Sequence, residues 1–131
     1  MKIKKIIIIH KEVSDIHLNK DPFVYLMAFK KLGIDAILIA DKNNITKKKG
    51  LPRIIDLNQK PQDINPKEMS SYLRYISREV STGSRISKII KEERPDAVML
   101  YDNPIFFQII RLANPRVKIC LFPYLYIVLS L

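Results

Sequence analysis

Short, uninterrupted runs of branched apolar residues are the sequence feature that most constrains how this chain folds. Residues 6–9 are four consecutive isoleucines, residues 37–39 read Ile-Leu-Ile, and residues 97–100 read Ala-Val-Met-Leu. A strand with one face in water alternates apolar and polar side chains, whereas a strand covered on both faces is apolar throughout. The runs therefore predict the buried strands of a parallel sheet.

Predicted strands alternate with predicted helices along the chain. We expect five strands, at residues 3–10, 34–40, 53–57, 97–101 and 117–122, and three helices, at residues 22–32, 66–93 and 104–113. Asp21 can cap the first helix, and Gly33 can end it. The second helix carries apolar side chains at positions 69, 73, 76 and 80, which is the spacing of an amphipathic helix. It either continues through Gly83 or restarts after it, and Pro95 prevents its extension.

The order of these elements predicts an α/β, Rossmann-like fold with an open, mainly parallel sheet and helices on both faces. A chain of 131 residues, 47% of them hydrophobic, supplies one modest core, so we expect a single domain over residues 1–131. In such sheets ligands bind at the carboxyl ends of the strands. The candidate substrate-binding residues therefore follow the first and fourth strands, and they are His10, Lys11, His17, Tyr101, Asp102 and Asn103.

Each candidate has a structural alternative to a role in binding. His10 and His17 can act as a general base or contact a sugar hydroxyl, or they can simply satisfy backbone groups. Asp102 or Asn103 can hydrogen-bond a polyhydroxyl ligand, or either can cap the helix that begins at Pro104. The ring of Tyr101 can stack on a ligand or pack in the core. The catalytic residues themselves are not identifiable from the sequence.

Glycines and cysteines exclude several kinds of site. The glycines are Gly33, Gly50 and Gly83, so none follows the first strand, where a dinucleotide-binding turn would lie, and the P-loop pattern is missing. One cysteine, Cys120, cannot form an intrachain disulfide, and it shows no metal-ligand spacing with the two histidines. We therefore expect no metal, no cofactor and a reducing, cytoplasmic location.

The charge balance of the chain predicts attraction to anions. Lysine and arginine number 23 against 13 acidic residues, a formal net charge of +10. This charge suits phosphorylated ligands or an anionic membrane surface, and the protein is expected to be soluble or peripheral because the apolar residues 119–131 are shorter than the roughly 20 that a spanning helix needs. Nucleic acid is disfavoured as a partner because the basic run Lys47–Lys49 has no interleaved aromatic residues and no recognised binding module.

Two segments resemble the N-terminal domain of GT-B glycosyltransferases, especially the family-4-like, or group 1, enzymes. In these domains a helix ends in a leucine-glycine pair before the second strand, as in AFKKLGIDA at residues 28–36, and a later helix ends in a charged turn, as in IIKEERPDAVMLY at residues 89–101. Asp96 of the second segment can hydrogen-bond the tight turn into its strand. The chain departs from the family in having no glycine after the first strand.

The resemblance implies the acceptor-side half of an enzyme that transfers a sugar from a nucleotide-sugar to a glycan or lipid-linked acceptor. The family's second domain, which holds most donor contacts, is not present in these residues, so we expect no activity from this half alone. Either another chain supplies the donor domain or the protein is a remnant, and the apolar residues 121–131 support both ideas because an exposed apolar segment tends to bind a partner. The expected partner is a donor-domain chain or a second copy of this chain. A non-catalytic module that holds a small anion or a protein partner is the alternative.

Overall fold

The protein forms an α/β structure of five strands and three helices. It is described by a computed structural model, which covers residues 2–11, 23–41, 53–58, 65, 67–101 and 103–122. The elements along the chain are β1 (Lys5–Ile9), α1 (Phe23–Lys31), β2 (Asp35–Ala40), β3 (Arg53–Asp56), α2 (Met69–Glu93), β4 (Ala97–Tyr101), α3 (Pro104–Ala113) and β5 (Lys118–Phe122). Each predicted strand and helix is present, with strands up to three residues shorter than expected.

All five strands run parallel in one sheet, with the order β3-β2-β1-β4-β5. The central strand β1 places Ile7 opposite Ile37 of β2 and opposite Val98 of β4. From β1 the chain builds outward through β2 and β3, and it then returns to add β4 and β5 on the other side of β1. The predicted Rossmann-like, parallel sheet is confirmed.

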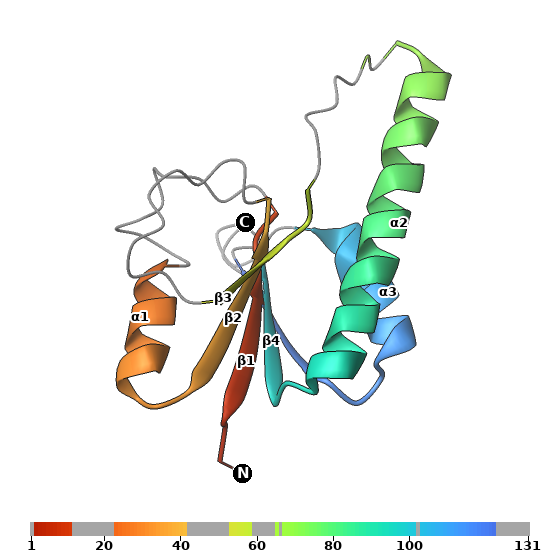
Figure 1. The fold of residues 1–131 in the computed structure, drawn as a ribbon. Helices are drawn as coiled ribbons and strands as arrows, with labels where there is room; N and C mark the ends of the chain where they lie inside the picture. Colours follow the sequence, from red (N-terminus) through yellow and green to blue (C-terminus); the bar gives the residue numbers. More distant parts are fainter. Residues whose placement is uncertain are drawn as a thin grey trace, which may run out of the picture.

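Helices cover both faces of the sheet, as the uninterrupted apolar runs require. Figure 1 shows α1 on one face and α2 with α3 on the other. Ile6 and Ile8 belong to the buried cluster that contains Leu26 of α1, whereas Ile7 and Ile9 belong to the cluster beneath α2 and α3. All four isoleucines are buried, so both faces of β1 are shielded from water, which explains why polar residues do not alternate with apolar ones in this run.

Helix α2 is continuous through Gly83, which settles the choice between one helix and two. A Cβ atom added at Gly83 would lie 2.9 Å from Ile109 Cδ1 and 3.3 Å from Phe106 Cδ1, both on α3. The glycine therefore permits close packing of α2 against α3 and does not break the helix. Gly33 has φ +73°, which confirms it as the end of α1, and α2 ends at Glu93, two residues before Pro95. Asp21, the expected cap of α1, lies outside the described residues.

The apolar side chains in the first half of α2 are largely exposed, whereas Ile86 and Ile90 in its second half are buried. Met69, Leu73 and Val80 are 72%, 56% and 43% exposed. The first half of α2 extends past the edge of the sheet (Figure 1), so it meets little of the core. The side of α2 that does face the sheet contributes Glu79, Ile86 and Ile90 among its buried residues. Within the described residues, no helix is long and apolar enough to cross a membrane.

Candidate functional site

The candidate site lies where the order of the strands reverses. The connections that leave the carboxyl ends of β1 and β4 lead to opposite sides of the sheet, and open α/β sheets bind ligands in the crevice expected at such a reversal point. His10 and Lys11 directly follow β1, Tyr101 is the last residue of β4, and Asn103 precedes α3. The structure thus brings four of the six predicted residues to one crevice. His17 and Asp102 lie outside the described residues.

The rings of His10 and Tyr101 stack across the two strand ends. Their centroids are 4.9 Å apart and their planes are inclined by 30°. The backbone N–H of His10 donates to the carbonyl of Ile39 at 3.0 Å, which continues the pairing of β1 with β2 and holds the start of the loop in place. Both residues are half-buried, and Tyr101 also packs against the cluster under α1. The stacked pair thus lies at the carboxyl ends of β1 and β4.

A buried carboxylate from α2 joins the residues that follow the two strands. Glu79 is 0% exposed, it forms an ion pair with Nζ of Lys11, and its Oε2 atom accepts a hydrogen bond of 2.8 Å from Nδ2 of Asn103. A charge without solvent needs partners of this kind, because water no longer stabilises it. Glu79 therefore links the loop after β1 to the loop after β4.

Asn103 is the cap of α3. Its Oδ1 atom accepts a hydrogen bond of 3.0 Å from the backbone N–H of Phe106, and its amide nitrogen donates to Glu79. The capping alternative weighed for Asn103 is therefore what the structure shows. Because its own side chain satisfies an amide at the start of α3, this helix end is less suited to binding an anion.

Lys11 contributes little net charge to the crevice. Besides its ion pair with Glu79, its ammonium group lies 5.9 Å from the ring centroid of Tyr75, within the range of a cation–π contact. Beside this network lie the stacked rings of His10 and Tyr101, and the hydroxyl oxygen of Tyr101 is buried. An imidazole can accept one proton and donate another near neutral pH, and an aromatic face suits an apolar ring surface.

Glu79 and Tyr75 are the members of this site that sequence reasoning missed. A signal for Glu79 was present, because it lies two and three helical turns before Ile86 and Ile90 and so shares their face. A carboxylate on the buried face of a helix requires a partner. The sequence did not show which residue would supply it, because Lys11 and Asn103 are distant in the chain.

A second ionic cluster lies at the opposite, amino-terminal edge of the sheet. Glu93 accepts from Nζ of Lys5 at 2.6 Å and from Nη2 of Arg53 at 2.6 Å, and hydrogen bonds from these two side chains, Lys5 first, hold the pKa of Glu93 below its ordinary value. Asp96 accepts from the backbone N–H groups of Lys4 at 2.7 Å and Lys5 at 3.0 Å, which lowers its pKa.

The hydrogen-bond partner predicted for Asp96, the turn that leads into its own strand, was therefore wrong. Its carboxylate binds the amides that enter β1, and the expected bonds within its own turn are not the ones that form. The reason is that β1 and β4 are parallel neighbours, so the amino ends of the two strands lie together. At neither edge do the described residues group three histidine, cysteine or acidic side chains that could hold a metal ion.

Comparison with known proteins establishes the fold alone. No protein-family model matches the chain, and no curated protein matches it. Among solved structures, the chain is similar to the C-terminal domain of the PF1911 hydrogenase from Pyrococcus furiosus, residues 78–226, with a TM-score of 0.59 and 14% identity over 92% of both chains. A second structure of that domain, residues 83–215, gives a TM-score of 0.58 and 15% identity over 92% of both chains. Sequence identity this low carries no information on activity.

Proposed function

We propose that this chain is the acceptor-side domain of a GT-B-type glycosyltransferase, which transfers a sugar from a nucleotide-sugar to a glycan or lipid-linked acceptor. The observation that carries the proposal is the stacked pair of His10 and Tyr101 at the reversal point of the sheet. This crevice is where an open α/β sheet binds its ligand.

The chemistry of the crevice favours a neutral, hydroxyl-rich ligand. The positive charge of Lys11 is paired with Glu79, and the start of α3 is capped by Asn103, so two groups that would attract an anion are already engaged. A sugar ring offers an apolar face to an aromatic platform and hydroxyl groups to an imidazole. His10 and Tyr101 present both of these features together.

A second wall is needed to complete the proposed enzyme. Transfer requires that donor and acceptor be held in reacting geometry, and one half of a cleft cannot hold both. The exposed apolar side chains of Met69, Leu73 and Val80 on α2 are of the kind that protein partners cover. We infer that the donor domain belongs to another chain or another segment and that the chain alone is inactive.

Co-purification and ligand binding test this proposal. The tagged chain is recovered from its native source, and the partner that accompanies it is tested for binding of UDP-glucose and GDP-mannose. In parallel, saturation-transfer NMR measures contact of the chain with a panel of methyl glycosides. The expected result is a glycoside signal that His10→Ala and Tyr101→Ala abolish. The control is Tyr25→Phe, which changes a tyrosine of α1 outside the stacked pair and should leave the signal unchanged.

Two outcomes would contradict the proposal. One is a strictly monomeric protein that shows no contact with any glycoside or nucleotide-sugar. The other is a partner chain that binds no nucleotide-sugar, together with a glycoside signal that survives both site variants. Either result supports the alternative, a non-catalytic module that uses this fold to hold a protein partner or a small anion.

A further inference from the structure

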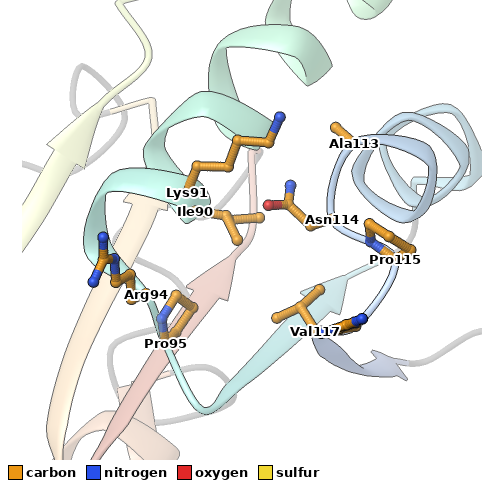
Figure 2. Close-up of a pocket in the computed structure, with 9 residues that line it drawn as sticks. Ile90, Lys91, Arg94, Pro95, Ala113, Asn114, Pro115 and Val117 are labelled. Carbon is orange, nitrogen blue, oxygen red and sulfur yellow. The ribbon is translucent and has the colours of Figure 1, made fainter.

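A groove lies at the amino-terminal edge of the sheet, at the opposite end of the molecule from the proposed sugar site. It is bounded by the end of α2 and by the turn that joins α3 to β5, and its volume is about 430 Å³. Figure 2 shows Ile90 of α2 and Asn114 of the turn directed toward the space between the two segments. Sites that bind small molecules have volumes of about 300–1,000 Å³, so the groove has room for one.

The base of the groove is apolar and its walls are held in place. Ile90 is 2% exposed and lies beside the half-buried Val117. The guanidinium group of Arg111 donates to the carbonyls of Pro115 at 3.0 Å and Val117 at 2.8 Å, which fixes the turn after α3. The side chain of Asn114 donates to the carbonyl of Ser87 at 3.3 Å, which joins that turn to α2.

Three exposed cations line the rim of this groove, and none of the described residues that line it is acidic. They are Lys91, Arg94 and Arg116, and in the part of the chain that the structure describes none of them forms an ion pair. The helix ends oppose them only in part, because α2 and α3 each contribute about half a negative charge at the carboxyl terminus. The groove therefore has a net positive charge.

Two of the three acidic residues near the groove in sequence are engaged elsewhere, and the third, the exposed Glu92, does not line the groove. Glu93 is bound to Lys5 and Arg53, and Asp96 accepts from the amides that enter β1. Both carboxylates thus lie toward β1, whereas the cations of the same connection line the side that faces the turn before β5. This separation of charge concentrates positive potential at one place.

We propose that the groove is a second binding site, for a small organic anion. Its phosphate or carboxylate group is attracted by the cations at the rim, Lys91, Arg94 and Arg116, and its apolar body packs against the base formed by Ile90 and Val117. This ligand class follows from charge complementarity above an apolar base, and it is independent of the sugar chemistry proposed at the other edge.

Phenyl phosphate is a suitable probe, because it combines a dianion with one apolar ring. Its titration into the isotope-labelled chain is followed by the NMR shifts of backbone amides. We expect saturable shifts at residues 90–94 and 113–117 and none at His10 or Tyr101. Benzoate tests a carboxylate on the same ring, inorganic phosphate tests the charge without the ring, and benzyl alcohol tests the ring without the charge.

Matched variants separate the groove from the general positive charge. Arg94→Gly removes a cation at a position with φ 50°, a backbone conformation that glycine adopts readily, and Arg116→Gln removes another. Each is expected to raise the dissociation constant for phenyl phosphate by roughly threefold to fivefold. Lys88→Gln removes the same charge from an exposed position of α2 that does not line the groove, and it should leave binding unchanged.

The proposal is overturned by any of three results. These are the absence of saturable shifts, an equal loss of affinity in Lys88→Gln and the two groove variants, and equal binding of benzyl alcohol and phenyl phosphate. Circular dichroism of each variant confirms that it is folded, and weaker binding of phenyl phosphate at about 1 M salt than at about 0.1 M salt would independently support a site that depends on charge.

Discussion

Helix α2 carries two glutamates that each pair with a lysine beside the central strand, but at opposite edges of the sheet. Glu79 binds Lys11, which follows β1, whereas Glu93 binds Lys5, the first residue of β1. The side chain of Glu79 is 1% exposed and that of Glu93 is 17% exposed. Two ion pairs of the same chemical type therefore differ in how far their carboxylates are exposed to water.

This difference determines what each contact can do for the protein. A buried carboxylate has lost its hydration, so its partners are obligatory, and removal of either one leaves polar groups unsatisfied. A partly exposed pair such as Glu93 with Lys5 regains full contact with water when it is broken, and salt screens it. The carboxyl edge, which holds the proposed sugar site, is thus rigidly specified by Glu79, whereas the cluster at the amino edge is replaceable.

The largest effect is expected from Glu79→Ala. The change leaves the ammonium of Lys11 and the amide of Asn103 without their buried acceptor, and we expect a loss of about 3 kcal/mol in the free energy of unfolding. Urea unfolding followed by circular dichroism measures it. The double variant Glu79→Leu with Lys11→Met removes both charges, so it should be more stable than Glu79→Ala, and equal stability of the two would contradict the role assigned to the buried pair.

A smaller effect is expected from Asn103→Ala. This variant loses the cap of α3 and one partner of Glu79, which predicts a destabilisation of about 1–2 kcal/mol. Asn103→Asp keeps an oxygen that can cap the helix but places a second carboxylate beside Glu79. If Asn103 stabilises the protein only by capping α3, Asn103→Asp should be as stable as the wild type. If the hydrogen bond to Glu79 also stabilises the protein, Asn103→Asp should be less stable than the wild type at neutral pH and should regain stability as the pH falls.

The smallest effect is expected from Glu93→Gln at the amino edge. We expect a loss of about 0.5–1 kcal/mol at low salt and less at high salt, because the partners Lys5 and Arg53 remain in contact with water. The same urea titration in low and high salt measures both values. A loss comparable with that of Glu79→Ala would remove the contrast between the two edges.

The pH dependence of Glu93 has a definite sign. Its pKa is lowered in the folded chain, so its contribution to stability is complete above the pKa of the unfolded chain, at about pH 5 and higher, and it is lost as the pH falls through the folded value. Glu93→Gln should therefore lose less stability on acidification than the wild type. Part of the acid dependence should persist in this variant because Asp96 also has a lowered pKa.

The elements and the fold class were largely predictable, because their signals are local. The isoleucines of residues 6–9 required cover on both faces, and Gly33 and Pro95 marked where helices end. The position of the proposed sugar site followed from the topology, since the residues after the first and fourth strands meet wherever those strands are neighbours. The apolar residues Ile86 and Ile90 marked the buried face of α2, whereas the apolar residues of its first half did not, because that half extends past the sheet.

The pattern of apolar runs, helix stops and turn residues was sufficient to specify a parallel sheet between two helical layers, because each of these preferences acts within a few residues of chain. Which groups meet across that framework was settled only when distant segments packed together. Glu79 is buried because α2 crosses beside the ends of β1 and β4, and its choice of Lys11 and Asn103 follows from the desolvation that this packing imposes.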